Sequence, residues 1–371
     1  MFEKLLDLIA QENYSDIHIT EDKPVAVRDV TWKIKKLDFI LDRDEIFWFA
    51  NSINTPTQID ALLQGEEIDN SYSYKWNRYR INMYYDMNWI NLALRKIPEK
   101  VPSMEEIWLP EHIKPVLAKD KWLILVTWPT WSWKSTTVAS LIEYINQNFY
   151  KHIITLEDPI EFVFEEKKAL IHQRTVGKHT LSWTRWIKYA LRQDPDVIMV
   201  WEMRDLETIQ SVLTLVETWH LVISTLHTVN APQTISRIID AFPPDKANMI
   251  ATQLSLSLEM IISQRLIETA DKQGRVAARE IMLQDPAISN LIREKKIAQI
   301  FSVMETSMWK WMITMDHSLA QLVAQNKITL ESALPHIRNK QTFDQLVQFY
   351  LKKNSKWKLK SYLKGFEEKS R

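Results

Sequence analysis

The segment 123–145 reads as a strand, a loop and a helix, with a lysine and a serine where the helix begins. The strand is the apolar run Leu123–Val126, and apolar residues of the helix recur at helical spacing, at Val138, Leu141, Ile142 and Ile145. Lys134 and Ser135 stand where the pattern G-x-x-x-x-G-K-[ST] places its last two residues, after a loop whose backbone amides surround phosphate groups. The segment therefore predicts an α/β domain with a phosphate-binding loop.

Tryptophan occupies both glycine positions of that pattern, at Trp128 and Trp133. Glycine is needed there because a backbone without a Cβ takes positive φ angles freely and approaches the phosphates closely. An indole at either position would fill the space of the phosphates, and a bulky side chain disfavours positive φ. The surroundings of the loop predict phosphate binding, whereas the residues of the loop itself contradict it.

The composition offers an explanation for this contradiction. The chain has 4 glycines and 16 tryptophans in 371 residues, whereas glycine usually makes up roughly 7% of a protein. Some bacterial lineages translate the codon UGA as glycine and others translate it as tryptophan. A gene from the first group, translated with the genetic code of the second, would give a sequence like this one, with tryptophan at glycine positions. We therefore expect most tryptophans to be glycine in the protein; the alternative is a chain with real tryptophans in an altered loop.

Composition also limits the class of protein and its location. Lys+Arg and Asp+Glu balance at 47 each, so no global charge attracts nucleic acid, and the absence of cysteine excludes disulfides, thiol nucleophiles and cysteine-ligated zinc. No apolar run approaches the length of a membrane span. The N-terminal segment Met1–Ile9 reads as an acidic amphipathic helix rather than a signal peptide, so we expect a cytoplasmic protein.

Prolines divide the chain near residues 98–115, where a polar stretch contains Pro98, Pro102, Pro110 and Pro115. We expect an N-terminal domain at 1–98, a linker at 99–115 and a second domain at 116–371. Alternating apolar residues predict a small α+β arrangement in the first domain, with a helix at Asp44–Ile53 and strands at Asp16–Thr20, Tyr79–Tyr84 and Ile90–Leu94.

The second domain begins with buried-type strands that alternate with helices, which is the pattern of a parallel sheet. The strands are expected at Leu123–Val126, His152–Leu156, Val197–Val200 and Leu221–Ser224. From about residue 245 the pattern becomes helical, at Ile250–Leu266, Ala287–Arg293, Ile297–Thr306, Ser318–Gln325 and Phe343–Leu351.

Two acidic motifs follow strands of the second domain. Thr155–Glu161 contains Glu157, a carboxylate that can orient or deprotonate an attacking water. Leu191–Asp205 contains a hydrophobic strand followed by Glu202, which is placed to hold Mg²⁺ or water. Taken alone, an acidic strand end is more often a solvated turn than a site.

A third motif, Thr218–Thr228, has histidines at both ends of a strand, His220 and His227. A single histidine is usually structural. The combination of this motif with the two acidic motifs and the phosphate loop is much more specific than any of them alone.

Together the motifs resemble the type II/IV secretion ATPase superfamily over the length of the chain. Leu191–Asp205 is similar to the signature L-R-x-x-P-D-x-I-x-V-G-E-M-R-D of that superfamily, with Trp201 at its glycine. Trp219 stands at the glycine before the first histidine of the family's histidine box, and Trp311 at the glycine that opens Trp311–Leu319. Motif glycines of the family thus coincide with tryptophans of this chain.

Within the superfamily, the chain resembles the ATPases that retract type IV pili. The resemblance lies in Ser15–Ile19, in Ile154–Glu161 and in Ala287–Glu294, where Ser289 replaces an arginine of the motif A-I-R-N-L-I-R-E. Pilus assembly ATPases of the superfamily carry an extra N-terminal domain and a four-cysteine zinc element, and this chain has no cysteine.

The resemblance implies a RecA-like P-loop ATPase domain preceded by a PAS-like α+β domain. It implies that Lys134 contacts the β- and γ-phosphates of ATP, that Ser135 ligates Mg²⁺, and that Glu202 supports Mg²⁺ or water. Glu157 is the expected catalytic carboxylate. The other expected nucleotide-binding residues are Trp128, Pro129, Thr130, Trp131, Ser132, Trp133 and Thr136.

The resemblance also implies a homo-hexameric ring. In such rings arginines of the N-terminal domain reach the nucleotide, and the candidates are Arg78, Arg80 and Arg95. Such an arginine can contribute about 10³ to 10⁵ in rate, although any one of them is as readily a residue of a solvated strand face. His220 and His227 are expected to sense the γ-phosphate and to couple it to neighbouring strands.

The implied function is ATP hydrolysis that drives pilus retraction and twitching motility at the cytoplasmic face of the inner membrane. The implied partners are a membrane platform protein of the pilus and related pilus ATPases, with no sequence-specific nucleic acid. The basic segment 351–371 can face anionic lipid or that platform, or form a solvated terminal helix. Two alternatives stay open: a structural ring subunit that does not bind nucleotide, and a motor for DNA uptake or type II secretion.

Overall fold

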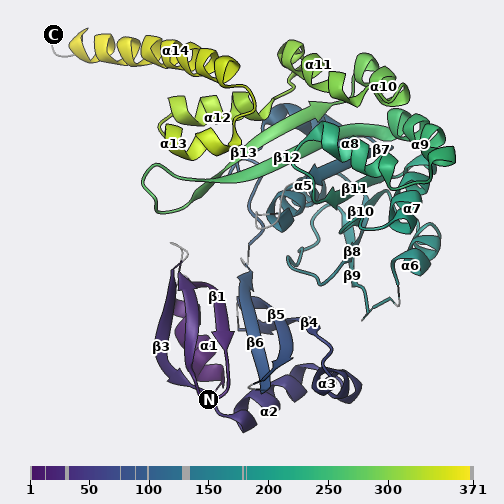
Figure 1. The fold of residues 1–371 in the computed structure, drawn as a ribbon, viewed down its shortest axis with the longest axis vertical. Coiled ribbons are helices and arrows are strands. Elements are labelled where there is room, and N and C mark those ends of the chain that lie inside the picture. Colours follow the sequence, from purple (N-terminus) through teal and green to yellow (C-terminus); the bar gives the residue numbers. More distant parts are fainter. Residues whose placement is uncertain are drawn as a thin grey trace. The chain divides into compact units, whose positions relative to one another are not determined.

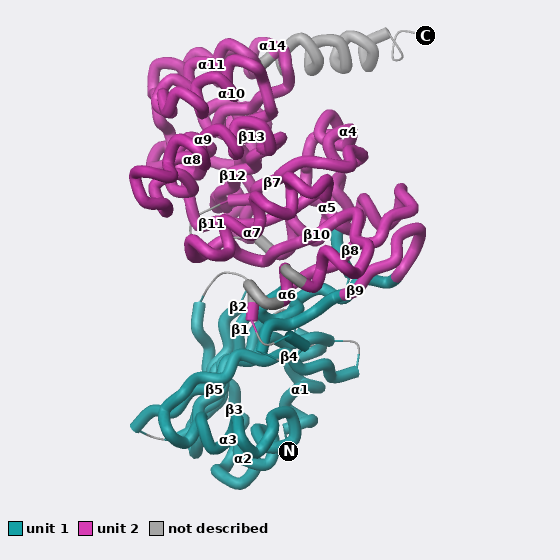
Figure 2. Tube along the Cα trace, turned by 90° about the vertical axis from the view of Figure 1, so that its right-hand side faces the viewer, with its two compact units in different colours: residues 1–102, 157–165, 173–181 teal, residues 103–156, 166–172, 182–371 magenta. Residues whose placement is uncertain are grey.

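The structure, a computed structural model, describes residues 2–367 except 13, 30–32, 76, 88, 98–99, 128–133, 178 and 181. For some residues inside helices, Lys134 among them, it describes the backbone but not the side chain. The described residues form two compact units (Figure 2): unit 1 contains 1–102, 157–165 and 173–181, and unit 2 contains 103–156, 166–172 and 182–371. The predicted boundaries at 98 and 115 stay predictions.

Unit 1 is an α+β unit built on a six-stranded sheet in the order β3-β2-β1-β6-β5-β4, with every neighbouring pair antiparallel. Its elements are α1 (Phe2–Gln11), β1 (Tyr14–Ile19), β2 (Pro24–Asp29), β3 (Ile34–Ile40), α2 (Arg43–Ile53), α3 (Pro56–Leu63), β4 (Ile68–Tyr74), β5 (Asn77–Asp86) and β6 (Trp89–Ile97). The predicted strands at 16–20, 79–84 and 90–94 and the predicted helix at 44–53 fall on β1, β5, β6 and α2.

The core of unit 1 lies between the helices and one face of the sheet. Alternate residues of β2 and β5 are buried, as the two-residue period of a half-buried strand requires. The apolar stripe of α1 supplies Phe2, Leu5, Leu6 and Ile9 to the same cluster. Asp42 and Thr55 start α2 and α3 with capping boxes, which satisfy the free amides at the helix N-termini.

Unit 2 is built on a seven-stranded sheet in the order β13-β12-β7-β11-β10-β8-β9. Its strands are β7 (Trp122–Thr127), β8 (His152–Glu157), β9 (Leu170–Thr175), β10 (Val197–Val200), β11 (Leu221–Leu226), β12 (Leu258–Glu268) and β13 (Arg275–Leu283), with Glu157 and 173–175 grouped with unit 1. Strands β8, β10, β11, β7 and β12 are parallel, and β13 is antiparallel to β12. The four predicted parallel strands are confirmed.

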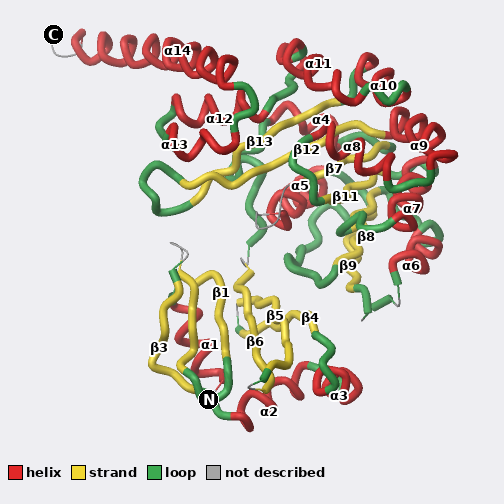
Figure 3. The backbone as a smooth tube through the Cα atoms, in the orientation of Figure 1, coloured by secondary structure: helices red, strands yellow, loops and turns green. Residues whose placement is uncertain are grey.

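Helices surround this sheet and continue beyond it (Figures 1 and 3). They are η1 (Glu111–Ile113), α4 (Lys114–Leu117), α5 (Lys134–Asn148), α6 (Trp183–Ala190), α7 (Leu206–Glu217), α8 (Ala231–Asp240), α9 (Pro244–Ser257), α10 (Pro286–Arg293), η2 (Ile297–Gln299), α11 (Ile300–Thr306), η3 (Met308–Lys310), α12 (Met315–Ala324), α13 (Leu330–Ala333), η4 (Leu334–His336) and α14 (Lys340–Glu367). In the described part of the chain, no helix has the length and apolar composition that a membrane span needs.

The predicted helix at 250–266 is wrong in its second half. Helix α9 ends at Ser257, and Leu258 begins β12, which pairs with β7 at the centre of the sheet. The side chains of 258–264 are buried on both faces, so the run shows no alternation that distinguishes a strand from a buried helix. The predictions also missed β13, which forms a long hairpin with β12.

Four tryptophans adopt a backbone conformation that suits glycine. Their φ angles are 128° at Trp89, 62° at Trp108, 69° at Trp219 and 70° at Trp311. Positive φ is an outlier for a bulky residue, because the Cβ crowds the backbone carbonyl. The side chains of Trp108, Trp219 and Trp311 are 62%, 73% and 63% exposed, so burial offers little compensation for the strain. The backbone at these positions supports the expectation of glycine.

Two of these positions are helix or turn endings that glycine usually fills. Trp219 follows Thr218, the C-cap of α7, and donates its amide to the carbonyl of Val216 at 3.2 Å. Trp108 donates to Glu105 at 3.0 Å, and the next amide, Leu109, donates to Met104 at 2.8 Å. This pair of bonds closes a helical turn through a residue in the left-handed region, which is most often glycine.

Replacing Trp219 or Trp311 by glycine is therefore expected to stabilise the chain, each by about 1 kcal/mol, because the left-handed strain disappears. The matched control is Trp48→Gly: this tryptophan is also exposed but lies inside α2, where glycine costs helix stability, about 0.5 kcal/mol. Thermal unfolding of the three variants checks the opposite signs. Loss of stability in all three would mean that tryptophan is the native residue at 219 and 311.

Candidate active site

Several of the predicted site residues follow strands that end at the carboxyl edge of the parallel sheet. Because β7, β8, β10 and β11 run in the same direction, they end at one edge, at Thr127, Glu157, Val200 and Leu226. Parallel α/β sheets bind ligands at this edge. Strand β7 ends at Thr127 and helix α5 begins at Lys134, as predicted for the two elements that flank the phosphate loop.

The phosphate loop lies mostly outside the described residues. This holds for Trp128, Pro129, Thr130, Trp131, Ser132 and Trp133, and for the side chain of Lys134. Ser135 and Thr136 are half-buried in the first turn of α5, where free backbone amides and the helix dipole favour an anion. Among the residues assigned to nucleotide binding, the structure therefore describes the start of the helix.

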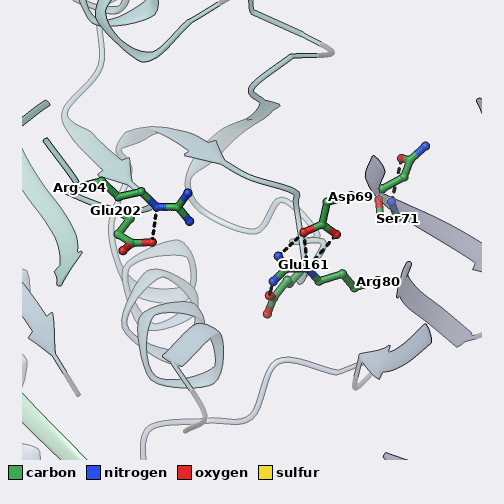
Figure 4. Close-up of polar contacts among 7 residues, drawn as sticks. Asp69, Ser71, Arg80, Glu161, Glu202 and Arg204 are labelled. Atoms are coloured by element: carbon green, nitrogen blue, oxygen red, sulfur yellow. Dashed lines mark hydrogen bonds and ion pairs between the residues drawn. The ribbon is translucent and has the colours of Figure 1, made fainter. Parts of the chain in front are cut away.

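Glu202 is the buried centre of a polar cluster in unit 2, whose other members, Arg204 and His227, are exposed. It lies two residues after β10 and is 7% exposed. Its Oε2 accepts a hydrogen bond from Arg204 Nε at 2.8 Å, and its Oε1 lies 3.0 Å from Nε2 of His227. Figure 4 shows the contact of Arg204 with Glu202. The structure thus brings together two of the predicted residues, Glu202 and His227, and adds Arg204.

The backbone around Glu202 is held by β11. Met203 donates its amide to the carbonyl of Thr225 at 3.0 Å, and Ser224 Oγ donates to the carbonyl of Val200 at 2.8 Å. The hydroxyl of Thr225 donates to the carbonyl of Trp201. These bonds continue the β10–β11 pairing past the end of β10. The carboxylate of Glu202 and the imidazole of His227 therefore project from two neighbouring segments of the chain.

His220 is not part of this cluster. It precedes β11, whereas His227 follows it, so the length of the strand, about 20 Å at the usual rise per residue, separates them. The imidazole Nδ1 of His220 lies 3.0 Å from the carbonyl of Leu215 and 3.1 Å from the hydroxyl of Thr218. Those contacts hold the turn from α7 into β11. The described contacts of His220 are thus those of a turn, and its role at a nucleotide stays a prediction.

Glu157, the expected catalytic carboxylate, ends β8 and is 4% exposed. Within unit 1 its Oε1 accepts a hydrogen bond from Gln173 Nε2 at 3.0 Å, and the same amide donates to the carbonyl of Phe162 at 2.8 Å. Gln173 was not predicted, because β9 carries no motif that indicates its proximity. A neutral amide donor orients the carboxylate without supplying a counter-charge.

Arg78 and Arg80 hold the chain that follows Glu157. Arg78 donates to Ser71 Oγ at 2.8 Å and to the carbonyl of Ile160 at 3.2 Å. Arg80 donates to Glu161 Oε1 at 3.1 Å and forms an ion pair with Asp69 (Figure 4). All of these residues belong to unit 1. Two of the three predicted arginines therefore bind the loop 158–161.

The charges around the two arginines differ, and so do their pKa values. Burial lowers the pKa of Arg78, against which the charge of Glu157 acts. Burial would also lower the pKa of Arg80, but hydrogen bonds and the charges of Asp69 and Glu161 raise it above its usual range. Both guanidinium groups stay charged at neutral pH.

Arg95 lies elsewhere. Its Nε and Nη2 are both 2.7 Å from Oδ1 of Asp16 across the β1–β6 pair. Its side chain is half exposed, and Asp16 lies in the first segment that resembles the retraction ATPases. The described contacts of Arg95 are thus those of a cross-strand ion pair, and its role at a nucleotide stays a prediction.

Several known proteins are similar to this chain in sequence. The model of the type II/IV secretion system protein family matches residues 103–350. The type IV pilus retraction ATPase PilT of Pseudomonas aeruginosa is 42% identical over 332 residues, covering 89% of this chain and 96% of PilT. A twitching motility protein of Neisseria gonorrhoeae is 43% identical over 303 residues, covering 81% of each chain.

Solved structures agree with these relatives. The crystal structure of the pilus retraction motor PilT with bound ADP matches with a TM-score of 0.83 and 40% identity, covering 92% of this chain and 98% of that one. The ATPase DotB of Legionella pneumophila matches with a TM-score of 0.76 and 27% identity, covering 90% of this chain and 94% of DotB. The matched range, the identity and the fold agree: the chain belongs to the type II/IV secretion system protein family.

Proposed function

We propose that this protein is an ATPase motor that retracts type IV pili. The observation that carries the proposal is the cluster of Glu202, Arg204 and His227 at the carboxyl edge of the sheet, where β11 pairs with β7, the strand that precedes the phosphate loop. The relatives named for pilus retraction and twitching motility support the pilus as the object of the motor.

Nucleotide binds at the start of α5 in this proposal. The backbone amides of 131–136 surround the phosphates, and the Lys134 ammonium contacts the β- and γ-phosphates. The PilT structure with bound ADP supports a nucleotide here. Glu157 accepts a proton from a water that attacks the γ-phosphorus, the bond from that phosphorus to the β-phosphate oxygen breaks, and ADP and phosphate leave. His227 and Arg204, which both contact Glu202, respond to the charge of the γ-phosphate.

The residues present fit Mg²⁺ as the metal. Its expected protein ligands are the hydroxyl of Ser135 and a carboxylate oxygen of Glu202, and hard oxygen ligands of this kind suit Mg²⁺. Among the described residues, no group of three His, Cys, Asp or Glu could hold a metal by itself. Mg²⁺ usually keeps several waters and binds substrate phosphates in addition to one or two protein ligands. When bound, Mg²⁺ would neutralise charge on those phosphates.

The proposal requires glycine in the phosphate loop. We infer that Trp128, Trp131 and Trp133 are glycine in the protein as its host makes it, because indoles there would occupy the phosphate site. The left-handed backbone at four other tryptophans supports the same reading of the gene at independent positions. If those residues are real tryptophans, the chain becomes a structural ring subunit without nucleotide.

Mechanical work would follow from the contacts of Arg78 and Arg80. These residues of β5 bind the loop that follows Glu157, so a movement of the sheet that contains β5 moves that loop. In the other direction, a displacement of Glu157 during hydrolysis moves the loop and, through it, the sheet. In a homo-hexamer such movements, taken in turn around the ring, would rotate a platform protein in the inner membrane and withdraw pilin. The same plan serves a motor for DNA uptake or type II secretion.

The proposed location is the cytoplasm, at the inner face of the membrane beside the platform protein and related pilus ATPases. Deletion of the gene in its host is expected to abolish twitching while surface pili persist or increase, because assembly continues without retraction. Electron microscopy of pili and a twitching assay check this. Loss of the pili themselves would contradict a role in retraction, and unchanged twitching with lost DNA uptake would favour the alternative motor.

A further inference from the structure

Two adjacent residues of β12 contact the elements on either side of the phosphate loop, the end of β7 and the first turn of α5. Ser263 Oγ lies 2.9 Å from Oγ1 of Thr127, the last residue of β7, and Gln264 Oε1 accepts a hydrogen bond at 2.8 Å from Oγ1 of Thr137, in the first turn of α5. All four side chains are buried. Because consecutive strand residues point to opposite faces, the two contacts reach these elements from the two faces of the sheet.

Arg279 of β13 supports Gln264 from the neighbouring strand. It is the register partner of Gln264, and its Nε donates to Gln264 Oε1 at 2.9 Å. That oxygen therefore accepts from both Thr137 and Arg279, which uses both of its lone pairs. Arg279 also donates from Nη1 to the carbonyl of Trp108, at 3.4 Å.

The burial of Gln264 and Arg279 lowers the stability of the fold. Arg279 is 5% exposed, no carboxylate in the described part of the chain forms an ion pair with it, and burial lowers its pKa to about 10. Nε2 of Gln264 has no hydrogen-bond partner among the described residues. Buried polar groups that are incompletely paired destabilise a fold, so their presence beside a site points to a functional use.

We propose that Gln264 and Arg279 are positioning residues of the nucleotide site, which hold the first turn of α5 through Thr137. The amides at the start of that turn face the phosphates, so a fixed turn keeps them in place before nucleotide arrives. Arg279 orients the Gln264 side chain, and Gln264 touches α5. The proposal rests on the proposed nucleotide site and assigns it two residues outside the motifs of the sequence.

The test uses a full-length chain with glycine at 128, 131 and 133, with Mg-ADP affinity and the KM and kcat for ATP as readouts. Gln264→Leu is expected to weaken Mg-ADP binding about tenfold and to raise KM similarly, with kcat within about twofold, because a misplaced turn weakens binding of substrate and transition state alike. Gln264→Glu keeps an acceptor for Thr137 and Arg279 and should restore the affinity.

The matched control is Arg265→Met on the next residue of β12, whose guanidinium contacts His336 at 3.2 Å and has no hydrogen bond to the described side chains of α5. It should leave Mg-ADP affinity unchanged even if it lowers the melting temperature as Gln264→Leu does. Thr137→Val removes the same hydrogen bond and keeps nearly the same side-chain shape, so it disturbs the core less than Gln264→Leu. It should also weaken Mg-ADP binding. It decides the question if Gln264→Leu does not fold.

Three outcomes separate the possibilities. Unchanged affinity in folded Gln264→Leu or Thr137→Val would overturn the positioning role. Equal weakening in Arg265→Met would overturn it too, since general destabilisation would then explain the result. Failure of the parent glycine chain to bind Mg-ADP would instead contradict the proposed nucleotide site on which this inference rests.

Discussion

Nucleotide binding is expected to appear when Trp128, Trp131 and Trp133 are replaced together by glycine. The chain with tryptophans should bind Mg-ATP at about millimolar dissociation constant or weaker, and the glycine chain about a thousandfold more tightly, near the micromolar range. The physical reason is geometric: the loop amides can converge on the phosphates only without side chains in that space. Titration calorimetry or a fluorescent ATP analogue measures the difference.

Two controls make this result specific. Adding Lys134→Ala to the glycine chain should remove the gained affinity, since the lysine is the cation of the loop. Glycine at Trp48 and Trp309, which lie away from the loop in sequence, should give no binding. The mass of the tryptic peptide Trp122–Lys134 from the native host shows directly whether the protein has glycine or tryptophan at these positions. A mass that matches tryptophan at every position would refute the recoding and the catalytic role with it.

Replacing Glu157 by glutamine in the glycine chain is expected to lower kcat about 10² to 10⁴-fold and to leave Mg-ADP affinity within a few fold. Glutamine keeps the shape of this buried side chain but cannot take a proton from water. Steady-state phosphate release, together with Mg-ADP titration, separates the two effects. Glu165→Gln, an exposed change in the segment that follows, is the matched control and should retain full activity.

A comparison with Glu202→Gln tests which of the two carboxylates is the catalytic base. That change also lowers kcat, but it removes a ligand expected for Mg²⁺ and the partner of Arg204 and His227, so activity should respond to added Mg²⁺. If Glu157→Gln keeps normal activity while Glu202→Gln has none, Glu202 is the base and the role given to Glu157 is wrong.

Local sequence predicted the parallel core well, because each signal there is short in range. Apolar runs that end in a motif predicted β7, β8, β10 and β11, and parallel strands bring their ends to one edge without further information. The same reasoning failed at 258–266, where burial on both faces removes the periodicity that separates strand from helix.

The contacts that complete the site are long in range, and no local pattern contains them. Gln173 reaches Glu157, Arg78 reaches the loop after Glu157, and Gln264 reaches α5, across 16, 82 and 127 residues of sequence respectively. None of these residues belongs to a motif whose spacing indicates its partner. The packing of strands against loops and helices decides these contacts, and it is a property of the whole fold.

The sequence by itself determined the family, the strand and helix on either side of the predicted phosphate loop, and the conflict between tryptophan and glycine, because motifs and composition are properties of the chain order. Only the tertiary structure decided which tryptophans take a left-handed backbone, that His227 and not His220 meets Glu202, and that Gln264 contacts α5. The reason is that φ angles, strand ends and cross-strand partners exist only once distant segments have paired.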